Sequence, residues 1–234
     1  MASCRRAPLP LLLVLVGCAT TPQRPGPATD GNCAALKGAW EGTLAGNSQG
    51  TGTPARRDEV TLRLVFAAEQ PRVFLVEGGK WIEAKSGKFH ARCLGPSAVV
   101  EAIDSDKDAD GTWVETWVLA VTVRGSEELL ARWIRMVNNV DVPLTNRSSK
   151  FSSEAVGTLR SVPMPAACRD QKTDGSTTLG QVFERQCDCG NADACEVLAL
   201  MLEREGNAAS LAEAKEARAK ACKLGSQQSC APAR

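Results

Sequence analysis

The sequence predicts an α+β multidomain protein in which an antiparallel β-barrel precedes a short disulfide-stapled α-helical repeat. Apolar and polar residues alternate through 36–162, and turn-forming residues interrupt them at short intervals, which is typical of about eight or nine strands in a meander. Apolar residues recur at helical spacing through 179–222. Two cysteine pairs of equal spacing lie in this helical part, Cys187 with Cys195 and Cys222 with Cys230.

The expected strands of the barrel each present an apolar face. Val60, Leu62, Leu64 and Phe66 share one face of a strand. Further along the chain, three more sets share faces: Val73 with Leu75; Trp113, Trp117, Leu119, Val121 and Val123; and Leu130, Ile134 and Met136. A segment of about 125 residues is long enough to bury one core.

The first expected strand, LKGAWEGTL, contains Gly38-Ala39-Trp40, and Arg160 lies near the end of the last strand. This combination resembles the lipocalins, whose first strand opens with Gly-x-Trp. The resemblance implies that Arg160 packs over Trp40 and closes the base of a lipocalin-like barrel. It also implies a cavity for an apolar ligand.

Five tryptophans could either line such a cavity or fill the core of a small barrel, namely Trp40, Trp81, Trp113, Trp117 and Trp133. We favour core filling.

The spacing of the helical cysteines requires a turn. Eight residues of straight helix rise about 12 Å, whereas a disulfide needs Cα atoms about 4.4–6.8 Å apart. Gly190 and Gly225 lie between the paired cysteines and accept the left-handed conformation of a helix C-cap. We therefore predict disulfides Cys187–Cys195 and Cys222–Cys230. Ser210 with Glu213 is expected to form a capping box at the start of the third helix.

The helical part resembles the Sel-like repeats, the cysteine-rich relatives of tetratricopeptide repeats. The residues that carry this resemblance are Ala194-Cys195, Leu198-Ala199, Gly206, Ala214, Lys220 to Gly225 and Ser229-Cys230. The match covers 178–230, little more than one repeat, and the aromatic positions of the family are Ala217 and Arg218 here. The resemblance implies a small docking module, and a generic disulfide-linked helical hairpin is the alternative.

Four further cysteines, Cys33, Cys93, Cys168 and Cys189, allow three pairings. A closed meander brings its first and last strands together, which favours Cys33–Cys168 with Cys93–Cys189. The other pairing, Cys33–Cys93 with Cys168–Cys189, needs no docking of barrel against helices and closes a loop of about 20 residues at modest entropic cost. We prefer this second pairing and keep the first open.

The N-terminus predicts export. Arg5 and Arg6 precede an apolar run, Leu9 to Val16, which is too short to span a membrane and is typical of a secretory signal. The ending Leu15-Val16-Gly17-Cys18 resembles the lipobox of bacterial lipoproteins. That resemblance implies an acylated Cys18 as mature N-terminus and, because Ala19 follows, sorting to the outer membrane.

These features give a signal peptide at 1–17, a flexible tether at 18–32 and a barrel at 33–166. A linker at 167–177 and the helical repeat at 178–234 follow. The eight cysteines left in an exported chain indicate disulfides.

Composition and motifs exclude several function classes. The net charge of +1 offers no basic field for nucleic acid. The run Asp104 to Gly111 resembles the front of a calcium loop, but Trp117 stands where the bidentate glutamate is required, so we expect a solvated hairpin. The single histidine, His90, lacks a nucleophile or metal-binding partner, and no active-site serine motif is present.

We therefore expect no catalytic residue, cofactor or metal. The expected function is that of a non-catalytic cell-envelope lipoprotein, membrane-bound through Cys18, that contacts a protein partner with its barrel and repeat. The alternative is a carrier of an apolar ligand.

Overall fold

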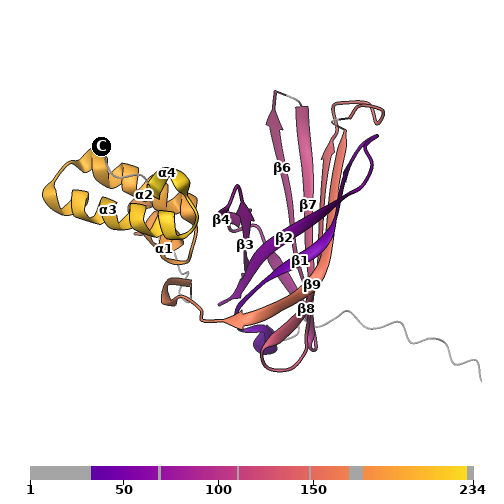
Figure 1. The fold of residues 1–234 in the computed structure, drawn as a ribbon, viewed down its shortest axis with the longest axis horizontal. Coiled ribbons are helices and arrows are strands. Elements are labelled where there is room, and N and C mark those ends of the chain that lie inside the picture. Colours follow the sequence, from indigo (N-terminus) through magenta and orange to yellow (C-terminus); the bar gives the residue numbers. More distant parts are fainter. Residues whose placement is uncertain (1–32, 68–69, 110, 148, 169–175, 231–234) are drawn as a thin grey trace, which may run out of the picture.

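A computed structural model describes residues 33–67, 70–109, 111–147, 149–168 and 176–230. A curled antiparallel sheet forms a half-barrel, and a group of helices follows it in the chain and lies beside it (Figure 1). The α+β architecture predicted from the sequence is confirmed.

The sheet contains nine strands in the described residues. They are β1 (Gly38–Gly50), β2 (Arg56–Phe66), β3 (Arg72–Glu77), β4 (Lys80–Ala84), β5 (His90–Leu94), β6 (Ser97–Asp108), β7 (Gly111–Val123), β8 (Glu128–Asn139) and β9 (Lys150–Val162). Their spatial order is β4-β3-β2-β1-β9-β8-β7-β6-β5. The first and last strands pair with each other, as a closed meander requires.

The two end strands of this order, β4 and β5, are halves of one broken strand. Every neighbouring pair is antiparallel, so β4 and β5 run in the same direction, one after the other. The upper half, β4, pairs with β3, and the lower half, β5, pairs with β6. The break spans Lys85–Phe89, where Lys85 has φ 43° and Gly87 has φ 72°. The sheet is therefore an open half-barrel of the nine described strands, and the break at Lys85–Phe89 connects its two edge strands.

The core lies on the inner face of the curled sheet. Its fully buried large side chains include Leu44, Leu62, Leu64, Leu119, Leu129, Trp133 and Leu159. The predicted inner faces of β2, β3 and β7 are confirmed. On β8, Leu130, Ile134 and Met136 do share a face, but it is the outer one, and Leu129, Ala131 and Trp133 enter the core.

Among the residues that the structure describes after the sheet, four α-helices follow: α1 (Leu179–Asp188), α2 (Ala192–Glu205), α3 (Ala208–Lys223) and α4 (Gln227–Cys230). Short 3₁₀ helices η1 (Cys33–Leu36) and η2 (Ala166–Cys168) flank the sheet in the chain. None of the described helices is long and apolar enough to cross a membrane.

The helix caps differ in part from the prediction. The N-cap of α3 is Asn207, whose side chain accepts from the N–H of Ala209 and Ser210. The predicted Ser210–Glu213 box is wrong, because Ser210 lies inside the helix and its hydroxyl donates to Glu205. A capping box does exist at α1, between Thr178 and Gln181, and the Thr-x-x-Gln spacing would have predicted it.

Candidate functional site

Both eight-residue cysteine pairs form disulfides across the same kind of turn. In the first, Gly190 has φ 103°, its N–H donates to Cys187 and the N–H of Asn191 donates to Gln186. This is the Schellman arrangement, which ends one helix and reverses the chain into the next. The disulfide Cys187–Cys195 has a Cα–Cα distance of 4.6 Å.

The second turn repeats the first. Gly225 has φ 98°, its N–H donates to Cys222, and the N–H of Ser226 donates to Ala221. The disulfide Cys222–Cys230 has a Cα–Cα distance of 4.8 Å. Both predicted helical disulfides are confirmed, together with the chain reversal at glycine on which they depended.

The remaining four cysteines form Cys33–Cys93 and Cys168–Cys189, with Cα–Cα distances of 5.5 and 5.0 Å. The preferred pairing is confirmed, but one reason given for it is wrong. The helices do dock on the barrel, and Cys168 and Cys189 are fully buried at that junction.

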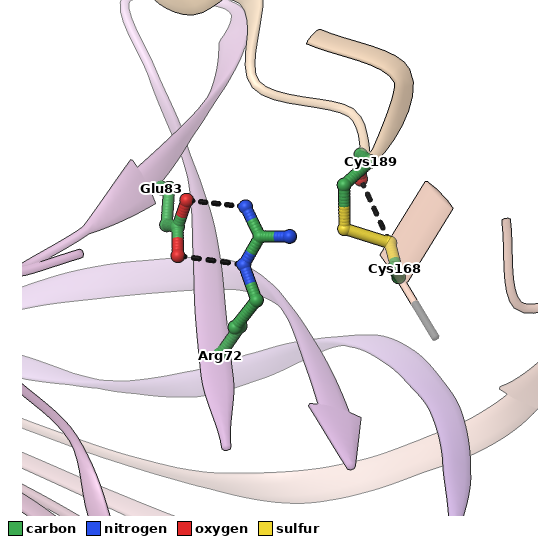
Figure 2. Close-up of a disulfide and its surroundings, with 4 residues drawn as sticks. All are labelled: Arg72, Glu83, Cys168 and Cys189. Carbon is green, nitrogen blue, oxygen red and sulfur yellow. Dashed lines mark hydrogen bonds and ion pairs between the residues drawn. A yellow bond between two sulfur atoms is a disulfide. The ribbon is translucent and has the colours of Figure 1, made fainter. Parts of the chain in front are cut away.

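Figure 2 shows the junction. The Cys168–Cys189 disulfide lies over the outer face of the sheet, against the apolar side chains of Ala39, Val65 and Phe74. Beside it, the guanidinium of Arg72 makes two hydrogen bonds to the carboxylate of Glu83, at 2.7 and 2.5 Å.

Both partners of this ion pair are more than nine-tenths buried. A buried ion pair is costly to break, because removing one partner takes a bidentate counter-charge from the buried charge that remains.

The β3–β4 hairpin provides a second contact with the helices. The N–H of Trp81 on β4 donates to the carbonyl oxygen of Leu224 at 2.9 Å. Lys80 donates to Asp193 at 2.5 Å and lies 3.8 Å from Glu196, both on α2. The hydrogen bond from Lys80 to Asp193 raises the pKa of Lys80. The disulfide and the hairpin thus fix the helices to the barrel at two separate places.

The base of the barrel is filled. Trp40 is buried and its indole N–H donates to the carbonyl oxygen of Leu36, in η1, at 2.9 Å. Arg160 does not lie over it. In the register of β1 with β9, Arg160 is opposite Glu41 while Trp40 is opposite Ser161, so Arg160 projects from the outer face and is exposed. In this structure η1, and not Arg160, covers Trp40.

The upper interior of the barrel holds a network of charges. The ammonium of Lys85, from the strand break, bonds both Glu115 on β7 and, at 3.0 Å, Asp104 on β6. Arg135 on β8 donates to Glu115 at 2.6 Å and stacks 4.7 Å from the ring centre of Trp117.

These contacts move the pKa values of the charged groups. Burial alone would raise the pKa of Glu115, but the bonds from Lys85 and Arg135 outweigh it and lower that pKa. Burial alone would lower the pKa of Lys85, but its two carboxylate partners raise it. Hydrogen bonds from Lys88 and then Lys85 lower the pKa of Asp104 to about 2. The network therefore stays ionised at neutral pH.

The interior leaves little room for a ligand. A pocket between β2, β3, β8 and β9 has a volume of about 120 Å³ and is lined by residues that include Leu75, Trp133, Arg135 and Phe151. A hollow of about 290 Å³ lies at the rim, next to the β1–β2 turn, and its lining includes Thr53, Pro54 and Phe151. Pockets for drug-sized ligands measure about 300–1,000 Å³ and are mostly apolar.

The five tryptophans have different surroundings. Trp40, Trp117 and Trp133 are buried in the core, and Trp117 and Trp133 pack edge to face with centroids 4.8 Å apart. Trp81 lies at the junction, where the guanidinium of Arg63 stacks on it at 4.6 Å. Trp113 lies near the rim, on β7, and its buried indole N–H has no hydrogen-bond partner among the described residues. Core filling is confirmed for three of the five.

Large apolar side chains are exposed on both parts of the molecule. On the helices these are Leu179, Val197, Leu200 and Leu211, and Leu200 is 52% exposed. On the outer face of the sheet they include Ile103, Leu130, Met136 and Val156. Apolar side chains exposed singly are common on protein surfaces, whereas neighbouring ones such as Val197 and Leu200, one turn apart on α2, can contribute to a contact surface.

The remaining residues singled out in the sequence do not come together in a site within the described residues. His90 is exposed at the start of β5, and the part of the chain described by the structure contains no group of three or more metal-ligating side chains that could hold a metal ion. The aspartate-rich run continues β6 into a tight turn with β7. Cys18, the signal and the tether lie outside the described residues.

Comparisons of this chain with family models, with curated proteins and with solved structures give no significant match.

Proposed function

We propose that this protein is a lipid-anchored component of a bacterial outer membrane that works by contacting other proteins. The chain would be held by an acylated Cys18, and a lipocalin-like barrel would carry a Sel-like helical repeat. The function would involve no catalysis, cofactor or metal.

The observation that carries this proposal is the fixed docking of the helices on the barrel. The buried Cys168–Cys189 disulfide and the Trp81–Leu224 hydrogen bond join the two parts. A rigid arrangement lowers the entropic cost of binding, because little has to be ordered when a partner arrives. Val197 and Leu200 are exposed on α2, the helix whose Asp193 anchors the hairpin, so they offer apolar contact area on a fixed frame.

The filled interior of the barrel favours a function in protein contact over a function in carrying an apolar ligand. Leu44, Leu62 and Leu119 close the lower half, and the ion pairs of Glu115 occupy the upper half. An apolar ligand would have to displace these ion pairs and leave charges buried without partners.

The anchor is tested by the variant Cys18→Ser. Acyl chains contribute about 0.8 kcal/mol for each buried methylene, so their loss should move the protein from the membrane to the soluble fraction. Unchanged fractionation would contradict the anchor.

Contact is tested by a photo-crosslinking amino acid placed at Leu200 in cells, with Lys215, an exposed polar position on α3, as control. A discrete adduct from position 200 and none from position 215 is expected. Native mass spectrometry of the delipidated protein provides the second measurement, and a stoichiometric co-purifying lipid would support the carrier instead.

A further inference from the structure

The strand break leaves one sheet edge unpaired. The lower half of β6 pairs with β5, from Ser97 opposite Leu94 to Glu101 opposite His90. Beyond Glu101 the strand continues to Asp108, paired only with β7 among the described residues. In an unbroken barrel wall the upper half of the fourth strand would pair here, but β4 pairs with β3 instead. Residues 102–107 of β6 therefore form an open edge.

The other side of the same opening is already covered. The N–H of Trp81 on β4 donates to Leu224, so the helices satisfy a backbone group at that edge. A sheet edge in this molecule is thus completed by a partner that is not one of its strands. The β6 edge has no such cover among the described residues.

Two backbone N–H groups of the β6 edge are satisfied by local side-chain hydrogen bonds. The N–H of Ser105 donates to the carboxylate of Asp104 at 2.9 Å, and the N–H of Lys107 donates to Asp106 at 2.7 Å. Side chains that bond the adjacent backbone compete with a strand partner, which protects an edge from indiscriminate pairing. A basic side chain that bonds Asp106 would release the N–H of Lys107, and an incoming strand would compete with Asp104 for the N–H of Ser105.

The side chains of the edge define the chemistry of such a partner. Asp106 is exposed on the face of β6 that also carries Asp104, whose carboxylate is already bonded by Lys85 and Lys88, and Ile103, which is 72% exposed, points to the other face. A basic residue of a neighbouring strand would face Asp106, and apolar residues on the opposite face of that strand would cover Ile103. An extended segment with alternating basic and apolar residues matches both faces.

We propose that residues 102–107 of β6 bind an extended basic segment of a partner protein by strand addition, which fills the opening in the barrel wall. Main-chain hydrogen bonds would give affinity, and the alternate side chains would give specificity. This inference rests on the proposed contact function and names the partner chemistry for one surface of it.

The test uses the full chain carrying Cys18→Ser and a synthetic peptide of seven alternating lysines and valines. Binding is followed by calorimetry and by amide hydrogen exchange. The expected result is binding that weakens at least tenfold between 50 and 500 mM salt, with slower exchange at residues 102–107. A peptide of alternating glutamates and valines should not bind.

Three variants distinguish the contribution of the backbone hydrogen bond from that of the carboxylate charge. Ser105→Pro removes one edge N–H, which edge strands tolerate, and should abolish binding, whereas Ser105→Ala should bind like the parent. Asp106→Lys should weaken binding at least tenfold. Binding that survives Ser105→Pro, or no binding by the parent, would overturn the proposal.

A second copy of the chain is the competing occupant. Amide exchange at residues 102–107 is therefore also measured without peptide at several protein concentrations. If exchange slows as the protein concentration rises, the edge pairs with a second copy and the proposal is overturned. None of these outcomes changes the crosslink at position 200 or the lipid content, which test the proposed function separately.

Discussion

The backbone N–H of Trp81 donates a hydrogen bond of 2.9 Å to the carbonyl oxygen of Leu224. This bond joins the edge of β4 to the end of α3, across 143 positions of sequence that include most of the barrel. The helices therefore act as the neighbour that β4 lacks in the sheet. Its geometry requires the glycine turns on both sides, Gly79 in the hairpin and Gly225 after α3.

We predict that Gly225→Ala destabilises the docking of the helices. A Cβ atom at this position would lie 2.0 Å from the carbonyl oxygen of Gly79, and φ is 98°. Backbone atoms on both sides would have to move apart. The expected loss is at least about 2 kcal/mol in the free energy of unfolding, because the steric cost adds to the roughly 1–2 kcal/mol of a left-handed non-glycine residue. Urea denaturation measures it.

Gly206→Ala is the matched control. Gly206 ends α2 with φ 70°, and nothing lies within 4 Å of an added Cβ. The free energy of unfolding should fall only by the conformational cost of a left-handed alanine, roughly 1–2 kcal/mol, and so by less than in Gly225→Ala. Equal losses for the two variants would show that the contact with Gly79 does not matter.

We predict that the Cys168–Cys189 disulfide alone joins the two parts covalently after cleavage of the linker. A protease recognition sequence inserted within 169–175 separates Cys168 from Cys189 in the chain. Without reductant, the two fragments should migrate together on a denaturing gel, and they should still do so in Cys33→Ala/Cys93→Ala.

The fragments should separate in Cys168→Ala/Cys189→Ala. If instead they stay joined only when Cys93 is intact, the pairing in the structure is wrong. The uncut Cys168→Ala/Cys189→Ala variant should also lose about 3 kcal/mol of stability, the typical effect of opening a loop of this length.

Local sequence patterns predicted most of the fold. Alternation gives the strands, because side chains on a strand point to opposite faces, and the glycine between paired cysteines gives the helix reversals. Which face of β8 is inward could not be read in this way, since Leu129 and Leu130 are both apolar neighbours. Register with β9 decides it, and register is a property of the assembled sheet.

Contacts between residues that are distant in the sequence were the hardest features to predict. No local signal shows that the chain between Lys80 and Leu94 changes its pairing partner at Lys85, which is the event that leaves the β6 edge open. The ion pairs of Lys85 with Asp104 and Glu115 likewise depend on three strands meeting. Four cysteines remained ambiguous for the same reason, because pairing requires spatial neighbours that sequence does not identify.

We predict that Asp104 contributes stability that is lost in acid. Its pKa is lowered in the folded protein to about 2, below the ordinary value of 3.8, by hydrogen bonds from Lys88 and Lys85. The contribution is therefore fully present above about pH 4 and disappears as pH falls towards 2. Asp104→Asn should be less stable than the parent at pH 6 by about 1 kcal/mol, with the difference closing by pH 2. A constant difference across this range would contradict the ion pairs.

We predict that the buried pair Arg72–Glu83 is costly to break but not to replace. Glu83→Gln removes the carboxylate charge that faces the buried guanidinium of Arg72 and should lower the free energy of unfolding by about 3–5 kcal/mol. Arg72→Met/Glu83→Leu removes both charges and should recover most of that loss, because desolvation of the pair offsets much of its attraction. Chemical denaturation of both variants measures the difference.

Glu154→Gln is the control, because Arg132 and Glu154 are 3.8 Å apart and largely exposed. The free energy of unfolding of this variant should change little. A Glu83→Gln variant as stable as Glu154→Gln would mean that water reaches the junction and that the helices do not seal it.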